Sequence, residues 1–303
     1  MAKRKKFSET ERKLIQLLPI GTKFNYERVE YTVSQPTCKP TVAKGECKTD
    51  VYVETTFKGG TRIFKISVKQ TNADFLENKI SHERATEIFG AKADEVIMNA
   101  TCSIGDVLKN TPLVYFEPSG KTSKNNITLG WKFEFLNVQS GKRSGALKLS
   151  KQQIVDVYSG TSLPSEKKDA IINGSIVPNS GVAEFIIVLD PNEDVTIKKF
   201  EDNIKTISEF IEENNPVIYF ACKALNYRLD AGKWDGNRPL SVYVDWSIKD
   251  GKLNAELKFD KPLYKRGNEI GNKVKELLAE LSITAANFSE LKTKLNASVT
   301  TFG

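Results

Sequence analysis

Residues 45–70 of the chain read GECKTDVYVETTFKGGTRIFKISVKQ, and this stretch decides the fold that we expect. β-Branched and aromatic residues are frequent in two runs, residues 50–57 and 62–70, and they favour β-strands. The pair Gly59-Gly60 lies between the runs and is typical of a tight turn. The stretch therefore predicts a β-hairpin with a carboxylate at the start of its first strand.

The two faces of the second strand differ in their chemistry. Side chains alternate along a strand, so one face is expected to carry Phe64, Ile66, Val68 and Gln70, and the other Ile63, Lys65, Ser67 and Lys69. The first set is apolar enough to pack on a core. Burying the two ammonium groups of the second set is costly unless they are paired or used, and Asp50 is the partner that we expect. An aspartate and a lysine on adjacent strands form a candidate site for a divalent cation and a phosphate.

The order Asp50, hairpin, Ser67-x-Lys69-Gln70 resembles the core of the PD-(D/E)XK nuclease superfamily. More narrowly, Gly45-Glu46-x-Lys48-Thr49-Asp50 followed by Lys65-Ile-Ser67-x-Lys69-Gln70 resembles type II restriction endonuclease-like proteins. The resemblance is concentrated in residues 45–90. It implies an α/β (α+β) fold, with a mixed central β-sheet flanked by helices and a strand–strand–helix order in the core.

The resemblance also implies roles for the residues of the hairpin. Asp50 would bind Mg²⁺, or Mn²⁺ in its place, and Lys69 would orient the attacking water. Thr49 stands before the aspartate where the motif has proline. A larger departure is Ser67, which stands where the superfamily has a second acidic metal ligand.

Because Ser67 offers only a neutral hydroxyl, another group must complete the metal site. Gln70 and Glu46 are the nearest candidate ligands, and Lys48 is a further candidate catalytic residue. In the superfamily an acid of the first helix can join the metal. The sequence leaves four such acids open, namely Glu9, Glu11, Glu27 and Glu30.

The composition is that of a globular protein with an acidic partner. Hydrophobic residues make up 39% and charged residues 27% of the 303, and no apolar run approaches the roughly 18 residues of a membrane span. The formal net charge is +7, and Lys and Arg displace counterions from phosphates. We therefore expect a cytoplasmic protein that binds double-stranded DNA and no membrane. Candidate phosphate contacts in loops are Lys121, Lys124, Lys142, Arg143, Lys233 and Arg238.

Other classes of site fail on spacing or on missing residues. The four cysteines form no C-x-x-C pair, which argues against structural zinc and for reduced thiols. The single histidine, His82, argues against serine and cysteine triads. The stretch Ser119-Gly120-Lys121-Thr122 lacks the upstream glycine of a phosphate loop, because Tyr115 stands there.

Hydrophobic periodicity and turn signals predict the remaining elements. We expect helices over residues 7–18, 72–89, 197–213, 271–281 and 285–295, β structure over 23–34 and 127–136, and a hairpin turned at Asp250-Gly251. Within residues 72–89, Ser81 is a candidate cap for a second helical segment that ends at Phe89. We expect one body over residues 1–303. Within it, residues 1–110 would form the catalytic core, and residues 111–303 a DNA-binding and structural extension with a C-terminal hairpin and helices.

The favoured function is a Mg²⁺-dependent endonuclease that hydrolyses phosphodiester bonds in double-stranded DNA at a specific sequence, as restriction enzymes do. Such enzymes often form dimers, so a homodimer is a candidate assembly. A first alternative is a DNA-binding protein on the same fold whose catalytic site has decayed, because the second acid is missing. A second alternative is that the hairpin is a plain structural element.

Overall fold

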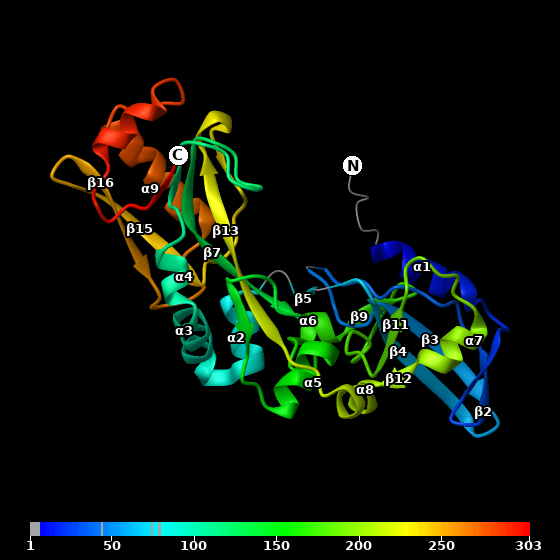
Figure 1. The fold of residues 1–303 in the computed structure, drawn as a ribbon. Helices are drawn as coiled ribbons and strands as arrows, with labels where there is room; N and C mark the ends of the chain where they lie inside the picture. The colour runs from blue at the N-terminus through cyan, green and yellow to red at the C-terminus, as the bar shows by residue number, and fades with distance from the viewer. Residues whose placement is uncertain (1–6, 44, 74, 78–79) are drawn as a thin grey trace. The chain divides into compact units, whose positions relative to one another are not determined.

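Figure 1 presents a computed structural model of the chain, which describes residues 7–43, 45–73, 75–77 and 80–303. The chain forms two compact units that alternate along the sequence. Unit 1 comprises Met1–Asp74 and Leu149–Pro216, and unit 2 comprises Phe75–Lys148 and Val217–Gly303. The chain therefore passes from one unit to the other three times, and neither unit coincides with the expected segments 1–110 and 111–303.

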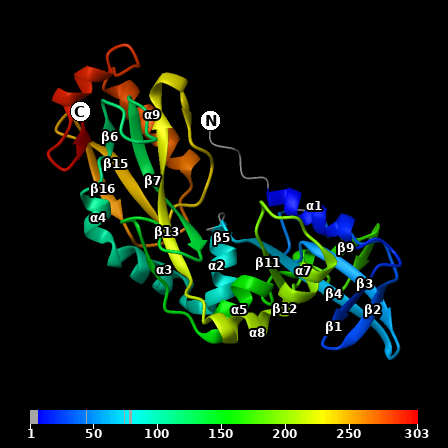
Figure 2. The ribbon, with the colours of Figure 1, turned by 45° about the vertical axis from the view of Figure 1, so that its right-hand side comes forward.

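Unit 1 is built on a six-stranded sheet in the order β1-β2-β3-β4-β11-β12. All neighbouring strands are antiparallel except β4 and β11, which are parallel, so the sheet is mixed as expected. The hairpin β3–β4 lies near its middle (Figure 2). The strands are β1 (Lys23–Tyr26), β2 (Val29–Val33), β3 (Val51–Phe57), β4 (Gly60–Gln70), β11 (Phe185–Leu189) and β12 (Lys205–Thr206).

Helices pack on this sheet and complete the α+β fold that the sequence predicts. Helices α1 (Phe7–Leu17) and α7 (Ile197–Asn203) contribute Leu14 and Phe200 to a core that they share with the sheet, and Leu18, directly after α1, joins them. Helices α5 (Lys151–Ser159) and α8 (Ile207–Asn214) pack on each other through Tyr158 and Phe210, whose ring centroids are 5.4 Å apart. The remaining elements of unit 1 are α6 (Ser165–Lys168) and the hairpin of β9 (Ala170–Ile172) and β10 (Ser175–Val177).

The two faces of β4 divide as the alternation predicts. Phe64 and Ile66 belong to the core of unit 1, and Val68 packs against that core. Phe64 stands at the centre of an aromatic cluster, with T-shaped contacts to Phe24 and Tyr31. The other face therefore remains for the polar residues of the strand.

Unit 2 is built on a nine-stranded sheet whose main path is β14-β13-β7-β15-β16. Its long strands are β7 (Asn126–Leu136), β13 (Tyr219–Arg228), β15 (Val242–Lys249) and β16 (Lys252–Lys258). Gly130 lets β15 approach β7 closely, because a Cβ there would lie 2.4 Å from the carbonyl oxygen of Val242. Shorter strands join the sheet, namely β5 (Phe75–Glu77), β6 (Val114–Tyr115), β8 (Ser144–Ala146), β14 (Lys233–Trp234) and β17 (Thr301–Phe302).

The C-terminal hairpin and helices that the sequence predicts are present in unit 2. Asp250 and Gly251 join β15 to β16 with φ angles of 51° and 71°, as the Asp-Gly signal requires. In the part of the chain that the structure describes, no helix has the length and apolar character to cross a membrane. The helical segments are α2 (His82–Phe89), η1 (Gly90–Lys92), α3 (Ala93–Ser103), α4 (Gly105–Lys109), η2 (Leu229–Ala231), α9 (Gly267–Glu280) and η3 (Phe288–Lys294).

Two predicted helices are wrong in part. The helix expected over residues 72–89 is helical only from His82, where Ser81 caps it, because Phe75–Glu77 instead pairs with β7. The helix expected over residues 197–213 is broken into α7 and α8. Ile204 leaves the helical conformation, and the two residues after it pair with β11 as β12. In both places a strand partner distant in sequence overrides local helical periodicity.

Candidate active site

Asp50 lies where β3 begins, and backbone contacts position its carboxylate against β4. The Asp50 N–H donates to the carbonyl of Ile66 at 2.8 Å, which continues the hairpin ladder by one residue. The N–H of Val68 donates to Asp50 Oδ2 at 2.8 Å, and the hydroxyl of Ser67 lies 3.4 Å from the same oxygen. The carboxylate is therefore held by β4 itself, one residue away from Lys69.

Lys65 and Lys69 lie on the polar face of β4, but they have different surroundings. Lys65 forms an ion pair with Glu184 at 2.8 Å and donates to the carbonyl of Asn179 at 3.1 Å. Its partner is therefore Glu184 and not Asp50, because the loop before β11 reaches it first. Lys69 forms no ion pair with any residue that the structure describes. Lys69 follows Val68, whose N–H holds the Asp50 carboxylate.

Ser67 is fully buried between Asp50 and the neighbouring strand β11. Its register partner on β11 is Ile186, an apolar residue. A buried hydroxyl beside a carboxylate donates a hydrogen bond but adds no charge. Ser67 thus lies next to Asp50 and supplies a neutral hydroxyl there.

Gln70 lies on the opposite face of β4, toward α1. Its amide nitrogen donates to the hydroxyl of Thr10 at 2.6 Å, and only 7% of the residue is exposed. The strand does not bend at its end to bring this amide to Asp50. Gln70 therefore serves to dock α1 on the sheet, and we do not include it among the ligands of the site.

The loop before Asp50 is attached to the turn before β11. The N–H groups of Lys48 and Thr49 both donate to the carbonyl of Gly181, at 2.9 and 3.2 Å. Glu46 is exposed in this loop. Burial, and after it the charge of Asp50, raises the pKa of the Cys47 thiol to about 11, so this thiol is neutral near pH 7. Glu46 is the acidic residue of this loop before Asp50, and its charge acts on Glu11 and Lys39.

Helix α1 brings Glu11 to the same place. The Gln70–Thr10 hydrogen bond fixes the preceding residue of α1 on β4, so Glu11 follows at the end of the hairpin. Burial raises the pKa of Glu11, and the charges of Asp50 and Glu46 raise it further, while Lys39 lowers it. Among the four acids that the sequence left open, Glu11 thus lies close enough to Asp50 for its pKa to respond to that charge.

Lys39 is a residue of the site that the sequence analysis missed. Cys38 pairs with Tyr52 through two backbone hydrogen bonds, of 2.9 and 3.2 Å, and this short bridge carries Lys39 past the start of β3. Lys39 forms an ion pair with Glu11, and although burial opposes the shift, this partner raises the pKa of the lysine. No local signal marks Lys39 in the sequence, because the contact joins residues 28 apart.

The carboxylates of the site suit a cation that takes few protein ligands. Among the residues that the structure describes, no group of three or more Asp, Glu, His or Cys side chains is arranged to hold a metal. Mg²⁺ is commonly bound by one or two carboxylates, with water and substrate phosphate completing its octahedron. Asp50, with Glu11 or Glu46 near it, fits this description. Burial is the main cause of the raised pKa of Glu11, and a cation would relieve the smaller contribution from the charges of Asp50 and Glu46.

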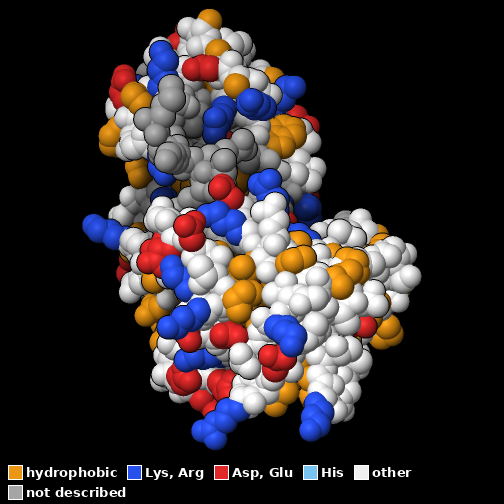
Figure 3. Space-filling view, turned by 90° about the vertical axis from the view of Figure 1, so that its right-hand side faces the viewer, with side chains coloured by type: hydrophobic (Ala, Val, Ile, Leu, Met, Phe, Trp, Pro, Cys, Tyr) orange, Lys and Arg blue, Asp and Glu red, His pale blue; other side chains and the backbone are white. Residues whose placement is uncertain are grey.

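The six basic residues predicted to contact DNA all lie in unit 2. Lys121, Lys124, Lys142, Lys233 and Arg238 are exposed, and Arg143 is half-buried. On the face drawn in Figure 3, Lys and Arg side chains alternate with Asp and Glu and form no continuous basic surface. The net charge of +7 is therefore not concentrated on that face.

Comparisons with known proteins leave the family open. No family model matches the sequence, and no curated protein matches it significantly. A solved structure that matches is the restriction endonuclease MspI in complex with its cognate DNA, with a TM-score of 0.32 and 12% sequence identity. The match covers 68% of this chain and 64% of that chain, which is less than two thirds of its length. At this TM-score the likeness carries no argument, so the function is inferred from the site.

Proposed function

We propose that the protein is a Mg²⁺-dependent endonuclease that cleaves phosphodiester bonds in double-stranded DNA. The observation that carries the proposal is the hairpin site: the Asp50 carboxylate held by Val68 N–H, with Lys69 directly after it on the polar face of β4. The order of elements supports it, because β4 is followed, after unit 2 residues, by α5 and then by the parallel strand β11. The helix expected directly after the hairpin belongs to unit 2, so α5 would take its place in the core of unit 1.

Each residue of the site has a role that its surroundings suit. Asp50 would hold the metal through the oxygen that does not face Val68 N–H, and Glu11 or Glu46 would supply the charge that Ser67 lacks. Bound Mg²⁺ would polarise the scissile phosphate and activate a water. Lys69 would position that water and balance negative charge on the phosphate as it reacts. Ser67 would keep the Asp50 carboxylate oriented.

The test is cleavage of a long double-stranded DNA in Mg²⁺ by wild type, Asp50→Asn and Lys69→Met. We expect each variant to lose activity by roughly a hundredfold or more, because each removes a charge from the reacting centre. Lys58→Ala, at the exposed turn of the same hairpin, is the matched control and should cleave like wild type. Undiminished cleavage by Asp50→Asn or Lys69→Met would contradict the assignment. Discrete fragments would indicate sequence-specific cleavage, and a smear nonspecific cleavage.

The second candidate is a DNA-binding protein whose site has lost catalysis. Ser67 favours it, since a neutral hydroxyl stands beside Asp50 where a second carboxylate would bind metal. This candidate predicts salt-sensitive DNA binding together with no cleavage in Mg²⁺ or Mn²⁺. Mg²⁺-dependent cleavage that requires Asp50 would exclude it.

A further inference from the structure

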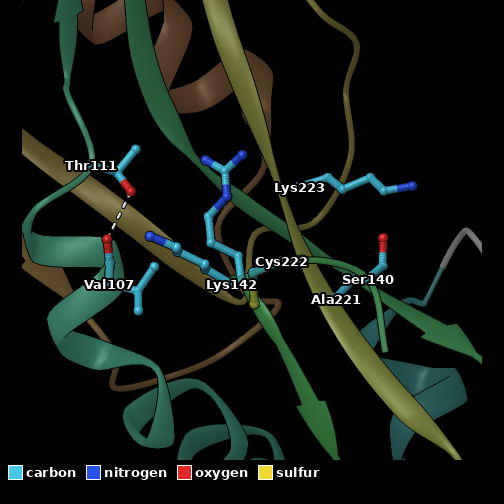
Figure 4. Close-up of a pocket in the computed structure, with 9 residues that line it drawn as sticks. Val107, Thr111, Ser140, Lys142, Ala221, Cys222 and Lys223 are labelled. Atoms are coloured by element: carbon cyan, nitrogen blue, oxygen red, sulfur yellow. Dashed lines mark hydrogen bonds between the residues drawn. The ribbon is translucent and has the colours of Figure 1, made fainter. Parts of the chain in front are cut away.

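A basic pocket of about 390 Å³ lies in unit 2, separate from the hairpin site of unit 1. This volume is within the range of pockets that bind small molecules. Thr111, which follows α4, forms part of its wall, and Ala221 and Cys222 of β13 contribute another part. Its cationic side chains are Lys142, Arg143 and Lys223 (Figure 4).

The turn that carries two of these cations is fixed to the sheet. It connects β7 to β8, and β8 pairs with the same strand, β13, that β7 pairs with. The N–H of Cys222 donates to the carbonyl of Arg143 at 2.8 Å, and the hydroxyl of Ser144 donates to the carbonyl of Phe220 at 2.6 Å. Gly141 allows the turn through its φ of 69°. Lys142 and Arg143 are therefore presented from an anchored backbone.

The charges around the pocket leave it strongly positive. Glu134 of β7, only 2% exposed, is paired with both Lys132 and Lys223, so its charge is already neutralised by its neighbours. Lys142 and Arg143 form no ion pair with a carboxylate in the described ranges of the chain. In Figure 4 the side chain of Lys142 extends toward Val107 and Thr111, whereas that of Lys223 points to the other side. The two unpaired cations thus belong to the pocket itself.

We propose that this pocket binds a backbone phosphodiester of duplex DNA, with Arg143 and Lys142 as its ligands. The guanidinium group offers a planar pair of donors that matches two phosphate oxygens, and the ammonium adds a second charge. The exposed hydroxyl of Ser140 lies at the same pocket and is a third donor. The Thr111 hydroxyl donates to the carbonyl of Val107 at 2.8 Å, so it contributes shape and no free proton.

The proposal rests on the proposed function, because it assigns to unit 2 a binding site for the DNA that the hairpin site of unit 1 would cleave. A single phosphate fills only part of the pocket, which leaves room for the adjoining sugar. A free nucleotide carries the same phosphate chemistry and is the other source of such a ligand. Duplex DNA is favoured because a long polymer can occupy this pocket and the hairpin site at different phosphates. A mononucleotide needs only one binding site.

The experiment measures duplex DNA binding in EDTA, where cleavage is absent, over a range of salt concentrations. The variant Lys142→Ala/Arg143→Ala should bind at least tenfold more weakly, and the slope of log K against log salt should fall by about 1, the value for one phosphate contact. The matched control is Lys249→Ala/Lys252→Ala, which removes two exposed charges from the same unit. It should change the affinity less than threefold. Ser140→Leu, which narrows the pocket without changing charge, should also weaken binding severalfold.

Several outcomes would overturn the proposal. If the 142/143 variant and the 249/252 control lost the same amount of DNA affinity, binding would depend only on the net charge of the protein. Unchanged binding by Ser140→Leu would mean that the pocket is not occupied. Displacement of the DNA by a 5′-mononucleotide at equal affinity would identify a nucleotide pocket instead. Failure of the nuclease proposal is distinguishable, because it appears as absent cleavage in Mg²⁺ while DNA binding still depends on residues 142 and 143.

Discussion

At the scale of single residues, Ser67 is where the chemistry of the site is set. It is fully buried, and its hydroxyl lies 3.4 Å from the Asp50 carboxylate. A carboxylate at this position would stand so close to Asp50 that the two could not both ionise without a cation between them. Serine avoids that repulsion, and under the proposed function the charge of a metal would be balanced by Asp50 with Glu11 or Glu46.

Ser67→Asp should convert the site into one that depends on metal for stability. We expect a lower melting temperature than wild type in EDTA, because two carboxylates repel each other in a buried place. Metal at a hundredfold excess over its Kd should then raise the melting temperature by roughly 5–10 °C. Ser67→Asn, similar in shape but uncharged, is the control and should show a smaller rise at the same metal concentration, because it adds no carboxylate to the site. If the melting temperature of Ser67→Asp were the same with and without Mg²⁺ or Mn²⁺, no metal would bind beside Asp50.

Glu11 should make the stability of the metal-free protein depend on pH. Its pKa in the folded state is raised above 4.5, mainly by burial and further by Asp50, so ionising Glu11 lowers the free energy of unfolding. The stability of wild type relative to Glu11→Gln should therefore be highest below pH 4.5 and fall as pH rises through the raised pKa. Urea unfolding in EDTA at several pH values measures this difference. A difference that grows with pH would mean that the ion pair with Lys39 outweighs burial.

At the scale of elements, the breaks in predicted helices have an identifiable cause. The chain between α7 and α8 pairs with β11, and Thr206 then starts α8 with a capping box. The hydroxyl of Thr206 accepts from the N–H of Glu209 at 3.2 Å, and the carboxylate of Glu209 accepts from the N–H of Thr206 at 2.8 Å. Pairing with β11 and the cap at Thr206 together break the single helix that the apolar stripe over residues 197–213 predicts.

Thr206→Ala should therefore destabilise unit 1 by about 1 kcal/mol, the usual value of an N-cap. The loss arises because the first N–H groups of α8 lose their acceptor. Thr206→Ser keeps the hydroxyl and should retain most of the stability. Both are measured as changes in the free energy of unfolding in urea. Equal stability of the alanine and serine variants would show that the capping box does not hold α8 in place.

At the scale of the whole molecule, the two units have separate sheets and separate sequence segments. Unit 1 has the aromatic cluster around Phe64, and unit 2 has buried Trp131, Phe133 and Trp246. All three tryptophans of the chain, Trp131, Trp234 and Trp246, lie in unit 2. Tryptophan fluorescence therefore reports on unit 2, whereas far-ultraviolet circular dichroism reports on both units.

Phe64→Ala should destabilise unit 1 by about 3–5 kcal/mol, because it empties a fully buried aromatic position. We expect circular dichroism to show a new transition at lower urea, while the fluorescence midpoint stays close to that of wild type. Phe133→Ala, the matched change in unit 2, should shift the fluorescence midpoint instead. Coincident shifts of both signals in Phe64→Ala would show that the chain unfolds as the single body expected from the sequence.

Local rules determined much of this protein from its sequence alone. The β3–β4 hairpin, the core face with Phe64 and Ile66, and the Asp250-Gly251 turn follow from alternation and from turn chemistry within a few residues. The placement of Asp50 beside Ser67 follows from the same hairpin, because its register fixes which residues oppose one another. These features need no information from distant parts of the chain.

Only the tertiary structure decided which other groups meet that hairpin. Gln70 faces Thr10 of α1, and this contact joins residues 60 apart. Glu11 and Lys39 reach Asp50 through helix docking and a backbone bridge, and Lys65 takes Glu184 as its partner. The return of the chain to unit 2 after residue 216 likewise depends on long-range strand pairing, such as that of β13 with β7. Such contacts result from packing and strand pairing over long sequence separations, which neither periodicity nor motif spacing encodes.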